Sequence, residues 1–434
     1  MMSAEPAPNR VPAAVRSGAS RLRGLFSDPG QLLAIVLVGA LAVRAIWLWL
    51  PQGSLIFDEA YYVNAARVLL GWAVPTGAHY AGSPVGLDPN TEHPPLGKVL
   101  MAASMLAFGD NGLGWRLPSL VAGMIGLGAV YGIVRATGET ARLGVLVVGL
   151  LAFENLTFVH GRIGTLDMMS LAAILVGAWL GLRGHWTLAG VACAVGSLVK
   201  LTGAFGLLAL LVYQVVVLVR SRRGATGRLG WEDLRPTLLL VSAYAVVSIA
   251  GLWALDLRFS GYGDPWAHLV HMMTFGAALQ TKGASGGIAS TPWQWLLDEG
   301  HINYLRVAVD TRVGSVVTGS LVKIDFRGAL NPVLLGALPL AFLFTFWYAW
   351  RKGSLLAIWC LAWAAANYLP YLPLALISHR IMYLYYFLPT IPALAVAVAI
   401  LLTRSGLPRM VAWGYIAAFL LAFAALFPFR QLPG

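Results

Sequence analysis

The chain has 434 residues, of which 59% are hydrophobic and 11% are charged, and its formal net charge is +12. This composition excludes an ordinary soluble domain and is typical of a polytopic membrane protein. The basic residues mostly lie in short segments between apolar runs, so membrane topology and anionic lipid headgroups explain them better than nucleic acid does. Both cysteines lie in apolar runs, so the sequence predicts no disulfide framework.

The apolar runs predict an all-α membrane protein with about eleven spans, since one span needs about 20 apolar residues. Residues 1–30 are rich in Pro, Ala, Ser and Arg, and we expect a disordered cytoplasmic N-terminus followed by a transmembrane domain over 31–434. The predicted spans are Gln31–Leu50, Leu117–Val134, Leu143–Phe158, Met168–Leu182, Trp186–Val199, Gly203–Val219, Thr237–Leu255, Pro332–Trp350, Leu355–Leu374, Met382–Leu402 and Val411–Phe427. The shorter run Gly97–Phe108 is expected to be an interfacial helix.

The distribution of Lys and Arg predicts the orientation of these spans. When the N-terminus is placed inside, the short inner segments carry a clear excess of basic residues. Two long segments, 51–116 and 256–330, then face outward. In the second segment, Asp264-Pro265 is expected to begin a helix that ends near Gln280. Long segments of this kind in a compact membrane protein are usually functional.

The acidic pair Asp58-Glu59 follows the first predicted span. A carboxylate outside the membrane can act as a general base toward a hydroxyl group, or it can help to hold a divalent cation. The alternative is helix capping, because the following residues Glu59–Leu70 are expected to be helical and acidic side chains favour a first turn.

The stretch from Glu92 to Lys98 carries a second group of ionisable residues. His93 precedes Pro94 and is expected to be extended, while Pro95 suits the first turn of a helix. Lys98 then lies near the positive end of that helix, which together with the lysine makes a plausible phosphate site. Snorkelling of Lys98 toward lipid headgroups is the alternative.

Further ionisable residues lie where predicted spans meet the outer surface, and such residues at membrane depth are costly and often functional. These are Arg44, Arg116, Arg162, Asp167, Lys200, His379 and Arg380. Any one of them could instead snorkel or pair with a neighbour. Taken together, they indicate recognition of a phosphate at the outer bilayer surface.

Five motifs occur in order along the chain. They are D-E at Asp58–Glu59, H-P-P-L-G-K at His93–Lys98, W-R-L-P-S at Trp115–Ser119, G-R-x-x-x-L-D at Gly161–Asp167 and R-x-x-Y-x-Y-Y-F-L-P at Arg380–Pro389. Together they resemble the protein O-mannosyltransferase family of GT-C glycosyltransferases. The resemblance covers roughly residues 44 to 392. It implies a GT-C fold and an inverting transfer of a sugar, mannose in this family, from a polyprenyl-phosphate donor to Ser or Thr of exported proteins at the plasma membrane, on its extracytoplasmic side.

The resemblance also assigns residues. It places the acidic pair at Asp58 and Glu59, with Asp58 as the base, and outer-face arginines at Arg44 and Arg116. Glu92 aligns with a carboxylate that helps to hold a metal in the related aminoarabinose transferases of lipid A, so a divalent cation is a possible cofactor. The full predicted substrate-binding set is Arg44, Glu92, His93, Lys98, Arg116, Arg162, Asp167, His379, Arg380 and Tyr383.

The acceptor stays open, because the second long segment has no MIR-type domain. A lipid or cell-wall glycan is an alternative acceptor, and a transporter or flippase is the rival outside enzymes. A transporter predicts ionisable residues near the middle of the membrane, whereas this sequence places them at the outer ends of its spans.

Overall fold

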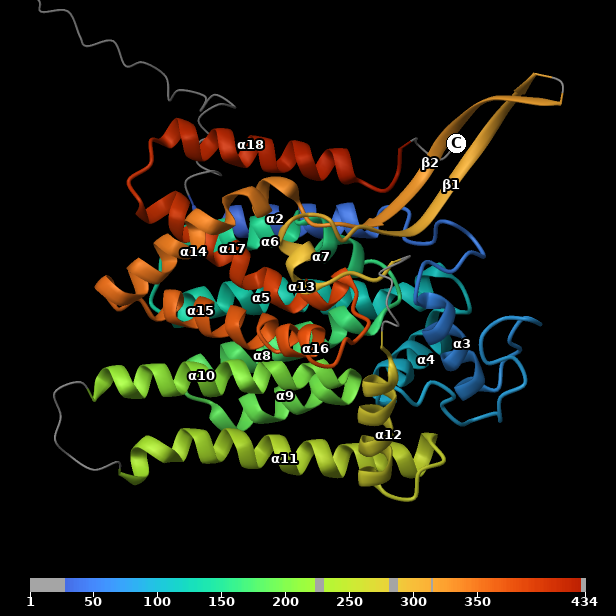
Figure 1. Ribbon diagram of the computed structural model, residues 1–434, viewed down its shortest axis with the longest axis horizontal. Coiled ribbons are helices and arrows are strands. Elements are labelled where there is room, and N and C mark those ends of the chain that lie inside the picture. The colour runs from blue at the N-terminus through green and yellow to red at the C-terminus, as the bar shows by residue number, and fades with distance from the viewer. Residues whose placement is uncertain (1–27, 223–229, 281–287, 314, 431–434) are drawn as a thin grey trace, which may run out of the picture.

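The computed structural model describes residues 28–222, 230–280, 288–313 and 315–430. Long helices lie side by side in one bundle, and a β-hairpin projects from one end of it (Figure 1). The predicted helical membrane fold is confirmed. Within the described residues, seven helical segments are long and apolar enough to cross a membrane, and five shorter apolar helices accompany them. These numbers are compatible with about eleven spans.

The helices, in chain order, are α2 (Pro29–Ala45), α3 (Glu59–Leu70), α4 (Leu96–Phe108), α5 (Gly112–Ala136), α6 (Ala141–Ala152), α7 (Asn155–His160), α8 (Leu166–Leu182), α9 (Trp186–Val199), α10 (Ala204–Ser221), α11 (Trp231–Phe259), α12 (Pro265–Ala278), α13 (Pro292–Leu296), α14 (Pro332–Lys352), α15 (Leu355–Tyr368), α16 (Tyr371–Leu376), α17 (Ile391–Arg404) and α18 (Arg409–Leu426), with 3-10 helices η1 (Leu201–Gly203) and η2 (Leu384–Thr390). The predicted disordered segment falls mostly on residues 1–27, outside the described part, and α2 already begins at Pro29.

Several predicted spans are divided in the structure, and polar caps or prolines mark the breaks. The run 143–158 becomes α6 and α7, because the Glu154 carboxylate accepts hydrogen bonds from Leu156 N at 3.1 Å and Thr157 N at 2.7 Å and so starts a new helix. Pro370 separates α15 from α16. The run 382–402 begins as the 3-10 helix η2, which contains Pro389.

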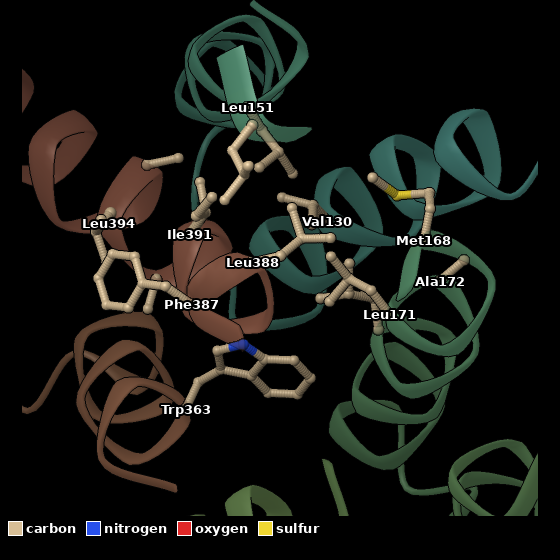
Figure 2. Close-up of a cluster of buried hydrophobic side chains, with 14 of the residues drawn as sticks. Val130, Leu151, Met168, Leu171, Ala172, Trp363, Phe387, Leu388, Ile391 and Leu394 are labelled. Carbon is tan, nitrogen blue, oxygen red and sulfur yellow. The ribbon is translucent and has the colours of Figure 1, made fainter. Parts of the chain in front are cut away.

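The core lies where α5, α6, α8, α15 and α17 meet, and Figure 2 shows part of it. Leu388 of η2 and Ile391 at the start of α17 lie among Val130 of α5, Leu151 of α6 and Leu171 of α8. Because lipid is as apolar as these side chains, such helices associate mainly through close packing. The core therefore fixes the helix ends that carry the functional residues.

The second long segment, 256–330, contains a β-hairpin that the sequence pattern did not predict. Strands β1 (Ile302–Val313) and β2 (Val316–Gly328) pair antiparallel, with three register irregularities. Tyr304 and Phe326 at its base are buried, whereas Val309 and Leu321 farther out are exposed. The predicted helix in the same segment is confirmed as α12, where the Asp264 side chain accepts a hydrogen bond from Ala267 N at 2.8 Å.

The two ends of the bundle differ in what they carry. One end gathers α3, α4, α12 and the hairpin (Figure 1). The opposite end carries basic turns: Arg220 at the end of α10 donates to Ala349 O at 3.0 Å, and Arg404 at the end of α17 pairs with Glu139 after α5. Helices α5, α10, α14 and α17 thus carry basic residues in their last turns, at the end away from the hairpin.

Candidate active site

A cavity of about 830 Å³ opens at the hairpin end of the bundle. We call it the central cavity. Its wall comes from the start of α3, the α3–α4 connection, the α9–α10 junction, α12 and the segment from α16 through η2. The polar lining residues are Asp58, Tyr61, Tyr62, His79, Asn90, Glu92, His93, Lys200, Thr202, Tyr371, Ser378, Arg380, Tyr383, Tyr385 and Tyr386. Five of the predicted site residues, Asp58, Glu92, His93, Arg380 and Tyr383, are therefore brought together.

Asp58 immediately precedes α3 and faces the central cavity. Its side chain makes no capping hydrogen bond to the helix, so the capping alternative is not supported. Burial raises the pKa of Asp58 to about 7, while the Lys200 ammonium opposes and the Asp167 carboxylate adds to this shift. A carboxylate with such a pKa can accept a proton near neutral pH, as a general base requires.

Glu59 points away from the cavity and has a different role from its neighbour. It is fully buried, and its two carboxylate oxygens pair with Arg116 Nε at 2.7 Å and Nη2 at 2.9 Å. The same carboxylate accepts hydrogen bonds from Ile56 N at 2.7 Å and Gly164 N at 2.8 Å. Glu59 therefore fixes the start of α3 to α5 and to the turn before α8, and of the predicted acidic pair only Asp58 lines the cavity.

Arg116 and Lys98 do not line the central cavity, although both were predicted to bind phosphate. Besides Glu59, Arg116 donates to the carbonyls of Leu48 and Leu50, both at 2.8 Å. Lys98 is fully buried, so it does not snorkel either; its Nζ lies 2.6 Å from Asp88 Oδ2 and donates to His93 O at 2.8 Å. These donors already have acceptors, which leaves little capacity for a substrate phosphate.

Three more predicted residues also lie outside the cavity lining. Arg44 is buried and donates to Ala152 O at 2.8 Å, and Arg162 is buried and donates to Ile46 O at 2.9 Å. Both guanidinium groups therefore satisfy carbonyls at helix ends. His379 is exposed on the turn before Arg380 and is not among the lining residues.

Lys200 and Asp167 form an ion pair at the edge of the cavity, with Nζ 2.6 Å from Oδ1. Lys200 lines the cavity directly, whereas Asp167 supports it from α8. The ammonium group also lies 5.0 Å from the ring centre of Tyr385 and 5.7 Å from that of Tyr386. The lysine is thereby held in place beside Asp58.

Arg380 is the second permanently charged cation of the described lining. Backbone hydrogen bonds from Arg380 N to Leu374 O at 3.0 Å and from Ile381 N to Leu279 O at 2.9 Å fix its segment between α16 and α12. Its buried Nε has no hydrogen-bond acceptor among the described residues. A buried donor of this kind is costly unless an acceptor is supplied, and an anion would supply it.

Glu92 and His93 line the cavity from the α3–α4 connection. Burial lowers the pKa of His93 well below its ordinary value, and the nearby positive charges of Lys200, Lys98 and Arg380 lower it further, so the imidazole is neutral. No group of three or more His, Cys, Asp or Glu side chains among the described residues is placed to hold a metal ion. A metal held partly by Glu92 therefore stays a prediction, and no chemical step is assigned to a metal.

The sequence-based prediction included Tyr383 but missed the other aromatic residues of the cavity wall. Tyr61 stacks on His79 with ring centres 4.0 Å apart, and Tyr371 stacks on Tyr386 at 5.6 Å. The Y-x-Y-Y run at 383–386 was the available signal, because in a 3-10 helix residues three apart share a side. Flat aromatic faces of this kind suit a sugar ring, which has apolar C–H faces.

The family model described as dolichyl-phosphate-mannose-protein mannosyltransferase matches residues 92–255. A polyprenol-phosphate-mannose–protein mannosyltransferase of Corynebacterium glutamicum is 32% identical over 157 residues, which is 35% of this chain and 29% of that protein. The Mycolicibacterium smegmatis protein of the same name is 34% identical over 140 residues, covering 32% of this chain and 26% of that protein. The matches thus span less than a third of these relatives, and the predicted resemblance is confirmed.

Solved structures extend the likeness to almost the whole chain. The yeast (S. cerevisiae) protein O-mannosyltransferase Pmt1–Pmt2 complex, bound to its sugar donor, superposes with a TM-score of 0.64 at 10% identity, covering 97% of this chain and 93% of that chain. ArnT from Cupriavidus metallidurans, bound to undecaprenyl phosphate, gives a TM-score of 0.57 at 18% identity, covering 93% of this chain and 64% of that chain. The chain has the GT-C fold. At these identities the likeness establishes the fold alone.

Proposed function

We propose that the protein is a membrane glycosyltransferase that transfers mannose from a polyprenyl-phosphate carrier to hydroxyl groups of exported proteins. The observation that carries this proposal is the central cavity, where the raised pKa of Asp58 and the cations Lys200 and Arg380 face one space. A base for the acceptor and a site for a leaving phosphate are the two parts that such a transfer needs. The names of the curated relatives support the donor and the acceptor.

The proposed mechanism is a direct displacement. The Asp58 carboxylate takes the proton from the acceptor's hydroxyl group. At the same time the hydroxyl oxygen forms a bond to the anomeric carbon of the sugar. The bond from that carbon to the phosphate oxygen breaks, and the configuration inverts. The phosphate leaves with one more negative charge, which Lys200 and Arg380 stabilise in place. His93 is neutral and Glu92 lines the same space, so these two orient the acceptor by hydrogen bonds.

The location of basic residues supports an extracytoplasmic cavity at the plasma membrane. The basic turns around Arg220 and Arg404 lie at the end of the bundle opposite the hairpin. Because cytoplasmic segments carry the excess of Lys and Arg, the cavity faces the other side. Nucleotide sugars are made in the cytosol, and a lipid-linked donor fits a site on this outer face.

A lipid or glycan acceptor is the second candidate, and one comparison favours it. An undecaprenyl phosphate-alpha-4-amino-4-deoxy-L-arabinose arabinosyl transferase of Pseudomonas fluorescens is 25% identical over 252 residues, which is 54% of this chain and 40% of that protein. This match is longer than those to the mannosyltransferases. The name of that relative gives a lipid-phosphate sugar donor and no protein acceptor, so a non-protein acceptor is the second candidate.

The decisive experiment supplies purified protein with polyprenyl-phosphate mannose carrying a radioactive label. Parallel reactions contain a Ser/Thr-rich peptide, a lipid or glycan acceptor, or no acceptor, and one series replaces the donor with a nucleotide mannose. Label on the peptide from the lipid donor is the expected result. Label on the glycan or lipid alone selects the second candidate, and transfer from the nucleotide sugar contradicts the proposed donor.

A further inference from the structure

The base of the β-hairpin contacts the residue immediately before Asp58. Tyr304 of β1 stacks on Phe57, with ring centres 4.2 Å apart and an interplanar angle of 22°. The Phe57 ring also meets the edge of Tyr385 at 5.5 Å. A strand far along the chain therefore holds the backbone segment from which the Asp58 side chain projects.

Phe57 needs such support because its backbone is strained. Its φ is +54°, in the left-handed region that side chains other than glycine rarely adopt. Such a conformation costs on the order of 1–3 kcal/mol and persists only where the surroundings enforce it. It turns the chain just before Asp58, so it helps to decide where the carboxylate points.

Tyr304 is itself held on several sides. Its hydroxyl shares a 2.8 Å hydrogen bond with His160 Nε2, and His160 Nδ1 lies 3.1 Å from Thr165 Oγ1. Burial and the nearby carboxylates of Asp167 and Asp58 raise the pKa of Tyr304 well above its ordinary value, so the hydroxyl stays protonated. On β2, a Cβ added at Gly328 would lie only 2.5 Å from the Tyr304 ring.

We infer that Tyr304 is a positioning residue that fixes Asp58 through the ring of Phe57, and that the hairpin base is thereby part of the active-site machinery. This inference rests on the proposed function, because it takes Asp58 as the base. It predicts that disturbing Tyr304 lowers turnover without weakening donor binding, since Lys200 and Arg380 are held by other elements. A residue that only fills space would change stability alone.

Gly328→Ala tests the inference without altering any residue of the cavity. The added methyl group displaces the Tyr304 ring, so kcat should fall at least tenfold while the apparent KM for polyprenyl-phosphate mannose stays within about twofold. Gly319→Ala on the same strand is the matched control, because a Cβ there meets nothing within 4 Å. The control should keep wild-type kcat and KM.

The pH profile gives a readout that a purely structural role would not move. Loosening Phe57 admits water to Asp58, which lowers its raised pKa, so the acid limb of kcat/KM in Gly328→Ala should move below its wild-type position near pH 7. Other titratable and charged groups around Asp58 stay unchanged in these variants: Lys200, Asp167, Tyr62, Tyr383, Tyr385, Glu92 and His93.

Two substitutions at Tyr304 complete the test. Tyr304→Phe keeps the stacked ring and should retain kcat within a few-fold. Tyr304→Leu removes the ring and should lower kcat as much as is expected for Gly328→Ala. Wild-type kcat and pH profile in folded Gly328→Ala would overturn the inference, even if Tyr304→Leu fails to fold. The proposed function has a separate test, because turnover retained in Asp58→Asn would contradict it without bearing on Tyr304.

Discussion

Replacement of Asp58 by Asn is the sharpest test of the proposed chemistry. The change is nearly isosteric and removes only the ability to accept a proton. Loss of a general base typically lowers the rate by about 10²–10⁴-fold. If Asp58 served only to cap α3, Asn would replace it well, but its side chain makes no capping bond. We therefore expect turnover to fall at least a hundredfold while donor binding persists.

The pH dependence of the wild-type protein should carry the same signature. As the proposed base, Asp58 would act in its ionised form, and burial raises its pKa to about 7. Below that pH the ionised fraction falls, so kcat/KM should drop about tenfold for each pH unit. An ordinary exposed aspartate, with its pKa near 3.9, would leave the rate flat between pH 5 and 8.

The assay measures transfer of labelled mannose from the lipid donor between pH 5 and 8, together with donor affinity and thermal stability. Glu59→Gln, at the neighbouring position, is the contrasting variant, because it should lower stability through a lost ion pair. Breaking its buried pair with Arg116 should cost about 3–5 kcal/mol of stability. A near-normal rate in Asp58→Asn, or an acid limb near pH 4 in the wild type, would refute the assignment of Asp58 as the base.

Three further predictions follow from the cavity and the topology. Arg380→Ala should weaken binding of the lipid donor roughly ten- to a hundredfold, because a charge-assisted hydrogen bond contributes about 1.5–3 kcal/mol; unchanged affinity by titration would contradict the phosphate site. Lys98→Ala should lower the thermal transition through loss of the buried Asp88 pair and leave donor affinity intact wherever the protein is folded. In a background without native cysteines, an impermeant thiol reagent should label Ser315→Cys but not Ser221→Cys on intact cells; the opposite pattern would reverse the orientation.

The sequence predicted the helices well because a membrane span has a strong local signal. Apolar runs of sufficient length identify them, and α9 begins and ends as expected at Trp186 and Val199. The breaks between α6 and α7 and between α15 and α16 depend on a capping carboxylate and a proline inside apolar runs. The hairpin was missed because strands gain their stability from pairing partners that local sequence does not reveal.

The site was only partly predictable, and the basic residues show why. Lys98, Arg116 and Lys200 all lie at helix ends that the sequence places on the outer side, and they look alike in the sequence. The structure pairs each of them with a carboxylate, Glu59 for Arg116, Asp88 for Lys98 and Asp167 for Lys200, but of the three only Lys200 also lines the cavity. Which cation can reach a substrate thus depends on how distant segments pack around it. Asp58 and Glu59 differ for the same reason, because only Glu59 meets Arg116.

Lys200 should affect both the proton transfer to Asp58 and the departure of the phosphate, whereas Arg380 should affect only the phosphate. In the proposed transfer Asp58 becomes neutral as the phosphate gains a negative charge, so negative charge moves across the cavity. Lys200 lowers the pKa of Asp58 before this transfer. Lys200→Met should therefore move the acid limb of kcat/KM to higher pH, because the remaining Asp167 charge also raises the pKa of Asp58. Arg380→Ala, which would lose only the proposed phosphate contact, should keep the limb near pH 7.

The double variant Lys200→Met with Asp167→Asn removes both opposing charges and should return the limb toward the wild-type position. A limb that is unmoved in Lys200→Met would show that Lys200 does not act on Asp58.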